Sequence, residues 1–293
     1  MAILTNWLIN KIHFFCPDDR GELDFSDNVF FCRICGREFP VIQNNFVSFL
    51  PKDPSDFSED ENKDYQNDYI DEFLQSDSLT RDSLAWGAPE LVPERWQKIR
   101  EGQVDLILRQ FTAPNESDYV CDFSAGAGYY TLQYAKYFNA VIHCDISMQN
   151  LNYCYKKAFQ MGIDNIFFLR IDYFHPPFNN SLKNVICIDS LIRGILHEER
   201  LLSTIKSSLA NDGFAYIDFH NWWHNPLRRL GFLKNNFGSN KSYTKKQAQS
   251  LINSKGLKIE KYIPFWQEAQ IYQKNIFTLL PPTRLVFKVS KKC

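Results

Sequence analysis

Residues 119–130 read Tyr-Val-Cys-Asp-Phe-Ser-Ala-Gly-Ala-Gly-Tyr-Tyr, and this stretch decides the fold. A short apolar run ends at Asp122, a loop containing Gly126 and Gly128 follows, and Tyr129 to Phe138 suits a helix. Glycines in such a loop let the backbone approach a ligand closely, and the start of a helix offers N–H groups for binding. The stretch therefore predicts a strand, a ligand-binding turn and a helix.

The same alternation of strand and helix continues to the end of the chain, starting at about residue 91. Strands separated by helices favour a parallel sheet with helices on both faces. The predicted strands are 119–121, 140–144, 166–171, 184–188, 214–219, 257–263 and 284–289. The predicted helices begin at Pro93, at Tyr129, at Ser147, which is predicted as an N-cap, near Leu201 and at Thr244. Residues 211–213 are predicted as a turn. The expected fold class is α/β, with a seven-stranded, mostly parallel sheet.

Four predicted strands end in an aspartate, at positions 122, 145, 172 and 189. Parallel sheets bind ligands outside the carboxyl ends of their strands, so a polar cofactor along that edge explains the repetition. Asp145 comes 17 residues after Gly128. A carboxylate at that place can accept hydrogen bonds from the two hydroxyls of a ribose, which indicates a nucleoside cofactor.

Two nucleoside cofactors compete for this loop. A nicotinamide dinucleotide requires a third glycine, where this chain has Thr131. Asp122, directly before the loop, suits a ligand with an amine better than one with a pyrophosphate. Both points favour S-adenosylmethionine, whose methionine end is zwitterionic. A tight turn without a ligand is the alternative.

Residues 118–220 resemble a class I S-adenosylmethionine-dependent methyltransferase, of the methyltransferase type 11 and ubiquinone-menaquinone-biosynthesis group. The loop of that family reads Asp-x-Gly-x-Gly-x-Gly. Ser124 replaces its first glycine, which is tolerable if the position needs no left-handed backbone. The resemblance implies a Rossmann-like fold, S-adenosylmethionine as cofactor, and methyl transfer. The cofactor-binding residues that it implies are Asp122, Phe123, Ser124, Ala125, Gly126, Gly128, Asp145, Ile146, Asp172, Tyr173 and Asp189. In the family, the counterpart of Asp172 holds the adenine amino group, its neighbour flanks the ring, and the stretch that Asp189 begins lies near the sulfonium.

The candidate catalytic residues follow the predicted strand 214–219. His220 is the predicted general base, and His224 shares that role or orients the acceptor, with Trp222 as an aromatic wall. Arg193 is predicted to meet an anionic substrate, and Trp86 and Tyr69 to cover the site. The alternative for the two histidines is a polar loop position without a catalytic role. The alternative for Arg193 is an ion pair with the acidic region, and the alternative for Trp86 and Tyr69 is ordinary packing.

The amino-terminal cysteines look like a zinc ribbon in which one ligand has been replaced. Cys16 and Asp19 form the first knuckle and Cys32 and Cys35 the second, so Asp19 stands where a ribbon has its fourth cysteine. His13 is another candidate ligand. Such a zinc would be structural, and the alternative is a ribbon that no longer binds metal.

Charge and texture divide the chain into three predicted regions. These are a zinc-ribbon-like β module at 1–52, an acidic linker or active-site cover at 53–90, and the methyltransferase domain at 91–293. Residues 53–90 hold 12 acidic side chains against Lys63 and Arg81, while 221–293 are basic, and the formal net charge is −1. The two charged regions are solvated faces or the surroundings of an anionic ligand.

The predicted function is methyl transfer to a small metabolite or natural product, with the acceptor atom and the oligomeric state undetermined. An RNA base is the alternative substrate, supported by the basic tail and the ribbon but not by the net charge. A methyltransferase-like binding subunit without catalysis is the alternative of another class. We expect no signal peptide and no membrane span. We also expect a reducing, cytoplasmic location, because the 8 cysteines follow no disulfide framework.

Overall fold

The computed structural model describes residues 7–42, 45–53, 94–111, 119–191, 195–224 and 242–292. Its contacts divide the chain into two units, which are described one after the other. Unit 1 comprises residues 1–92 and 112–182, and unit 2 comprises residues 93–111 and 183–293. None of the described helices is long and apolar enough to cross a membrane.

Four parallel strands form the sheet of unit 1, in the order β5-β6-β7-β4. They are β5 (Tyr119–Phe123), β6 (Ala140–Asp145), β7 (Ile166–Ile171) and β4 (Phe46–Phe49). Every residue of β5, β6 and β7 is buried. Parallel strands that are covered on both faces have such nearly continuous apolar runs, which is why the sequence pattern identified these three.

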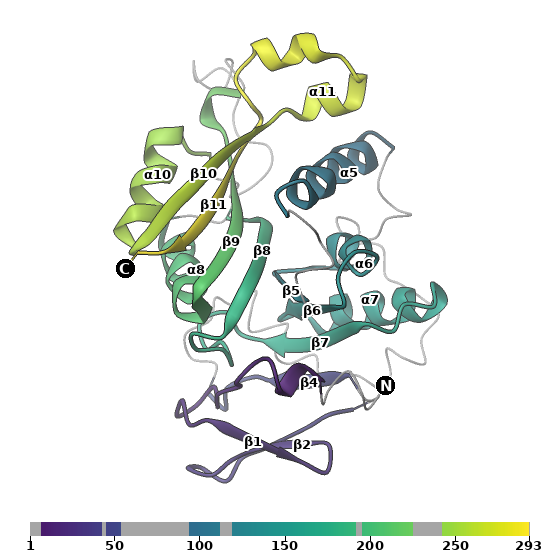
Figure 1. The fold of residues 1–293 in the computed structure, drawn as a ribbon, viewed down its shortest axis with the longest axis vertical. Coiled ribbons are helices and arrows are strands. Elements are labelled where there is room, and N and C mark those ends of the chain that lie inside the picture. Colours follow the sequence, from purple (N-terminus) through teal and green to yellow (C-terminus); the bar gives the residue numbers. More distant parts are fainter. Residues whose placement is uncertain are drawn as a thin grey trace. The chain divides into compact units, whose positions relative to one another are not determined.

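Two helices of unit 1 pack on these strands, α6 (Tyr129–Tyr134) on β5 and β6 and α7 (Met148–Gln160) on β6 and β7 (Figure 1). The hydroxyl of Ser147 caps α7 by accepting a hydrogen bond from the Asn150 amide (3.4 Å), as its position before the helix predicted. The two helices also touch each other, because Gly128 lies directly against Cys154 of α7. A Cβ atom at Gly128 would lie 2.1 Å from the Cys154 sulfur. Gly128 therefore permits an approach that no other residue would allow.

A separate three-stranded antiparallel sheet precedes the parallel strands in sequence. It consists of β1 (Leu23–Ser26), β2 (Val29–Cys32) and β3 (Glu38–Pro40), drawn in purple beside β4 (Figure 1). Phe49 of β4 packs against three phenylalanine rings of this small module, those of Phe14, Phe30 and Phe39. Strand β4 thus joins the parallel sheet through its backbone and the small module through its side chains.

Unit 2 contains the strand order β10-β11-β9-β8, in which β11 runs antiparallel to both of its neighbours. The strands are β8 (Leu182–Leu191), β9 (Leu209–His220), β10 (Leu257–Phe265) and β11 (Arg284–Lys291). The helices are α5 (Glu94–Leu108), α8 (Ile195–Ser208), α10 (Lys245–Ser254) and α11 (Gln267–Tyr272), with 3₁₀ helices η3 (Trp222–His224) and η4 (Asn275–Leu279). Helix α8 packs on β9, α10 on β10, and α11 on both α5 and η4.

The predicted α/β fold with a mostly parallel sheet is confirmed, and all seven predicted strands are present. Two details differ. Strand β4 lies next to β7, although the sequence placed residues 46–49 in the amino-terminal module. Residues 211–213, predicted as a turn, belong to β9, where Asp212 pairs with Lys183 of β8 (3.6 Å). The turn prediction was wrong because a neighbouring strand, which the local pattern does not reveal, supports this segment. The three domain boundaries stay predictions.

Candidate functional site

The glycine loop after β5 is held in a left-handed conformation at three positions. Ser124 has φ 58°, Gly126 has φ 56° and Gly128 has φ 83°. The condition under which we expected Ser124 to replace glycine freely is therefore not met, and this serine carries backbone strain. A Cβ atom at Gly126, in contrast, would meet nothing within 4 Å. The loop thus presents its backbone to open space at Gly126, which is where a ligand can approach it.

Asp145, the last residue of β6, holds this loop in place. One carboxylate oxygen accepts a hydrogen bond from the Gly126 amide (2.8 Å), and the other accepts one from the Ser147 amide (2.9 Å). The side chain is only 6% exposed. The aspartate predicted to bind ribose therefore also links the glycine loop to the start of α7.

Behind the loop, three buried side chains form a hydrogen-bonded chain from β5 through α6 to β6. The Thr131 hydroxyl donates to the Asp122 carboxylate (2.6 Å) and lies 2.8 Å from Nδ1 of His143. Burial raises the pKa of Asp122 to about 7, with a smaller contribution from the charge of Asp145. Burial also lowers the pKa of His143 to about 3, so its imidazole is neutral. The chain places Asp122 under the loop, where its role toward a cofactor amine stays a prediction.

Sequence reasoning missed His143 and treated Thr131 only as a missing glycine. Both lie at positions that the apolar pattern of β6 and α6 assigns to the core. A polar residue inside an otherwise apolar strand was the signal that could have identified His143.

Residues 172–178 follow β7 and complete the cofactor edge of unit 1. The Asp172 carboxylate accepts a hydrogen bond from the Phe174 amide (2.9 Å) and contacts Nδ1 of His175. Tyr173 is 9% exposed, and its ring lies 6.2 Å from that of Phe123. The predicted adenine-binding residues are thus ordered by their own segment.

Unit 1 brings together most of the predicted cofactor-binding residues. Strands β5, β6 and β7 are adjacent and parallel, so their carboxyl ends lie at one edge. That edge carries Asp122, Phe123, Ser124, Ala125, Gly126, Gly128, Asp145, Ile146, Asp172 and Tyr173. Asp189 belongs to unit 2.

In unit 2, Asp189 is part of a charged cluster that the sequence did not reveal. Arg284, the first residue of β11, contacts the Asp189 carboxylate and lies 3.3 Å from that of Asp218 in β9. The Asp189 amide donates to Asp218 (2.8 Å). Burial raises the pKa of Asp218 to about 7 although Arg284 acts in the opposite direction. The cluster fixes Asp189, whose φ is 61°.

The predicted catalytic residues His220 and His224, and the predicted aromatic wall Trp222, lie at the end of β9 and in the 3₁₀ helix η3 that follows it. Nε2 of His224 lies 3.0 Å from the Glu268 carboxylate of α11, and the other Glu268 oxygen accepts a hydrogen bond from Thr283 (2.9 Å). Glu268 is half-buried, which alone would raise its pKa, but the hydrogen bond with His224 lowers it. A carboxylate that fixes one imidazole nitrogen is the arrangement of a histidine base. Glu268 was missed because nothing in its local sequence points to His224.

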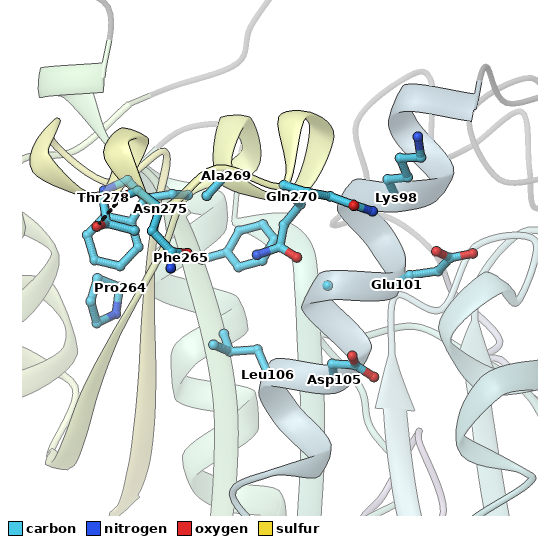
Figure 2. Close-up of a pocket in the computed structure, with 13 residues that line it drawn as sticks. Lys98, Glu101, Asp105, Leu106, Pro264, Phe265, Ala269, Gln270, Asn275 and Thr278 are labelled. Atoms are coloured by element: carbon cyan, nitrogen blue, oxygen red, sulfur yellow. Dashed lines mark hydrogen bonds between the residues drawn. The ribbon is translucent and has the colours of Figure 1, made fainter.

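Unit 2 also contains a cavity of about 460 Å³ between α5 and the α11–η4 segment. Figure 2 shows Lys98, Glu101 and Asp105 on the α5 side and Gln270 on the α11 side. Phe265 adds an aromatic ring. The volume lies in the range of small-molecule sites, and the lining is mainly polar.

The four predicted metal ligands of unit 1 lie together. Their ligand atoms, those of Cys16, Asp19, Cys32 and Cys35, are all within 4.8 Å of one another. His13 instead pairs with Glu22 (2.6 Å) on the surface. The Cys16 and Cys35 sulfurs are 3.8 Å apart, and the Cys32 sulfur lies 3.4 Å from both Asp19 oxygens. Tetrahedral zinc with bonds of about 2.3 Å to sulfur requires sulfurs about 3.8 Å apart, so the donors fit this metal.

Three predicted substrate residues, Tyr69, Trp86 and Arg193, lie outside the described residues, as does most of the acidic region 53–90.

Residues 120–213 match the family model of a methyltransferase domain. A comparison with curated proteins finds no match.

Three similar solved structures illustrate the range of chemistry on this fold. Magnesium protoporphyrin IX methyltransferase from Synechocystis PCC 6803, with bound SAH, is 17% identical over 69% of this chain and 88% of its own, with a TM-score of 0.51. Geranyl diphosphate C-methyltransferase from Streptomyces coelicolor A3(2) is 13% identical over 71% and 87%, with a TM-score of 0.51. The [4+2]-cyclase SpnF is 13% identical over 67% and 83%, with a TM-score of 0.54. At these identities the likeness establishes the fold.

The buried carboxyl of Asp122 predicts a measurable pH dependence of stability. It titrates at about 4 in the unfolded chain and at about 7 in the folded protein. The folded state holds the extra proton between these values, so Asp122 lowers the free energy of unfolding as the pH rises through that window. Asp122→Asn removes this loss. In urea denaturation, the free energy of unfolding of the variant should rise relative to that of the wild type by up to ~1.4 kcal/mol per pH unit between about pH 4 and pH 7. Above pH 7 the difference between the two proteins should stay constant.

His143 acts in the opposite direction, because a lowered histidine pKa makes stability rise with pH. It is present in both proteins and cancels in their difference. Asp164→Asn, at an exposed position, is the control and should give a flat difference. If the difference in free energy of unfolding between Asp122→Asn and the wild type also did not change with pH, the raised pKa of Asp122 would be contradicted.

Proposed function

We propose that this chain, whose residues 120–213 match the family model of a methyltransferase domain, is a class I S-adenosylmethionine-dependent methyltransferase that transfers a methyl group from that cofactor to a small organic molecule. One observation carries the proposal: the glycine loop presents open backbone at Gly126 while the Asp145 carboxylate holds it from the end of the next strand. A backbone surface beside a strand-end carboxylate suits the ribose and methionine parts of the cofactor.

Each predicted cofactor contact has a distinct task in this proposal. Gly126 and its neighbours supply backbone groups, Asp145 accepts hydrogen bonds from the ribose hydroxyls, and Asp172 with Tyr173 receives the adenine. A carboxylate has about four acceptor positions, so Asp145 can keep its two amide donors and still bind ribose. The cofactor supplies an electrophilic methyl carbon when bound, and the protein mainly positions donor and acceptor.

We assign proton removal from the acceptor to His224, with Glu268 as its positioning residue. The 3.0 Å contact to Glu268 uses Nε2 as donor, which leaves the Nδ1 lone pair to accept a proton. His220, the base that the sequence favoured, stays a second candidate. Trp222 is proposed as an aromatic wall for the acceptor.

A small molecule is the acceptor class that the observations favour. The cavity between α5 and α11 has the size of such a ligand, and α11 carries both part of its lining and Glu268. Two similar structures are named for small substrates, a porphyrin and geranyl diphosphate. An RNA base is the second candidate, supported by the basic residues after position 220. A methyltransferase-like binding subunit without catalysis is the third candidate.

We also propose a structural zinc ion at Cys16, Asp19, Cys32 and Cys35. The distances between the donor atoms support it, and four protein ligands would leave no open position for catalysis. The described cysteines form no disulfide bonds with one another, which supports the proposed location in a reducing cytoplasm.

Binding of S-adenosylhomocysteine tests the cofactor assignment. We expect calorimetry to show one site per wild-type chain. In Asp145→Asn, an amide group replaces one of the two acceptor oxygens, so the affinity should fall about tenfold or more. Asp164→Asn is the control and should bind like the wild type. Wild-type protein that binds neither S-adenosylhomocysteine nor S-adenosylmethionine would favour the non-catalytic alternative.

Methyl transfer with labelled S-adenosylmethionine tests the acceptor class and the base. A deproteinised small-molecule extract should accept label, and purified total RNA should not. His224→Gln should lower the rate about 100-fold without changing the affinity for S-adenosylhomocysteine, because only the proton acceptor is lost. A larger loss in His220→Gln than in His224→Gln would assign the base to His220, and label in RNA would support the second candidate.

Elemental analysis tests the metal site. Purified protein should contain about one zinc per chain, and Cys35→Ser should lose it. Asp18→Asn is the control, because Asp18 pairs with Arg37 next to the cluster without belonging to it. Removal of zinc by a chelator should lower the melting temperature, since structural zinc stabilises the fold it is bound to. Protein that binds no zinc even after zinc is added would contradict the site.

A further inference from the structure

We propose that Arg20 is a positioning residue, which uses the metal-binding turn as an anchor to hold residues 172–178 in the conformation that binds the cofactor. This inference rests on the proposed function. Both partners belong to unit 1, although Arg20 lies 156 residues before Pro176 in the chain.

The first knuckle is a tight turn from Cys16 to Gly21. The Cys16 amide donates to the Gly21 carbonyl (2.8 Å), the Arg20 amide donates to the Cys16 carbonyl (3.0 Å), and the Gly21 amide donates to the Asp19 carboxylate (2.8 Å). Arg20 has φ 65°. In this conformation the Asp19 side chain lies in the cluster of proposed metal ligands, while the Arg20 side chain reaches residues 176–178. A metal bound by Cys16 and Asp19 therefore also fixes the place from which Arg20 extends.

Three successive carbonyls of the cofactor segment accept hydrogen bonds from this turn and its neighbour. The Arg20 guanidinium donates to the carbonyls of Pro176 and Phe178, the second at 3.0 Å. The Phe15 amide donates to the carbonyl between them, that of Pro177 (2.8 Å). Arg20 is an exposed residue, but its donor is a charged guanidinium, and hydrogen bonds from a charged donor are stronger than those between neutral groups.

Aromatic packing connects the same segment to the glycine loop. The Phe178 ring is fully buried and packs between Phe14 (5.8 Å) and Phe123 (5.9 Å). Phe123 immediately precedes Ser124 of the loop, and its ring also lies beside Tyr173. The anchored end of the segment is thus packed against the residues proposed to receive the cofactor.

The segment requires such an anchor because it contains no helix or regular strand. Asp172 orders its beginning through the Phe174 amide, and the two prolines near its end have no N–H with which to bind a neighbour. Its end is held through carbonyl oxygens, two of which bind Arg20. A looser segment would have to be ordered when the cofactor binds, which lowers the affinity.

The test compares Arg20→Gln with Arg33→Gln, using the full chain with its zinc. Arg33 is an exposed arginine of the same module that pairs with Asp24. Zinc content, hydrogen exchange of residues 172–178 and the affinity for S-adenosylhomocysteine are measured for each protein. Arg20→Gln should keep its zinc, exchange faster at the Phe174, His175 and Phe178 amides, and bind about tenfold more weakly. Arg33→Gln should match the wild type.

Two further proteins separate positioning from general stability. Arg20→Lys keeps a cation that can reach one carbonyl, so its exchange and affinity should be intermediate. Wild-type protein stripped of zinc should show the same faster exchange at residues 172–178. Unchanged exchange and affinity in Arg20→Gln would overturn the inference, and so would faster exchange spread over the whole chain. A wild type that binds no S-adenosylhomocysteine, while exchange still responds to Arg20, would refute the proposed function and leave the anchor supported.

Discussion

The candidate site of unit 1 depends on the hydrogen bonds that the Asp145 carboxylate accepts. It ends β6 and accepts one backbone hydrogen bond from the glycine loop and one from the start of α7. Hydrogen bonds to an ionised acceptor are stronger than those between neutral groups. This side chain therefore supports, together with backbone hydrogen bonds of Ala125 and Gly128, a loop in left-handed conformation that includes the strained Ser124. Without it, the Gly126 amide would lose its side-chain partner, and the start of α7 would keep only the cap that Ser147 provides.

Both units bury charged or polar side chains near the ends of their strands. In unit 1, Asp122 is linked through Thr131 to His143, and in unit 2, Arg284 lies between Asp189 and Asp218. The raised pKa values of Asp122 and Asp218 mean that the fold disfavours their charges at neutral pH. Such groups reduce stability and are enriched at functional sites, where a fixed polar frame serves binding.

The amino-terminal module contributes to the same unit in three ways. Its strand β4 extends the parallel sheet, its aromatic rings cover Phe49, and its first knuckle bonds to residues 176–178. A metal ion at the cluster would thus stabilise more than the module itself. The proposed zinc and cofactor sites, which are far apart in the sequence, are connected by the contacts of the Arg20 turn.

The sequence by itself determined the seven strands, the glycine loop, the capped start of α7 and the grouping of Cys16, Asp19, Cys32 and Cys35. These features follow from local patterns: continuous apolar runs, glycines between a strand and a helix, and pairs of metal-ligating residue types three positions apart. Only the tertiary structure decided that β4 lies beside β7, that Glu268 holds His224, that Arg284 joins Asp189 to Asp218, and that Arg20 reaches Pro176. Those partners are far apart in the chain, and a local pattern records that a residue is buried or charged without recording which distant residue it meets.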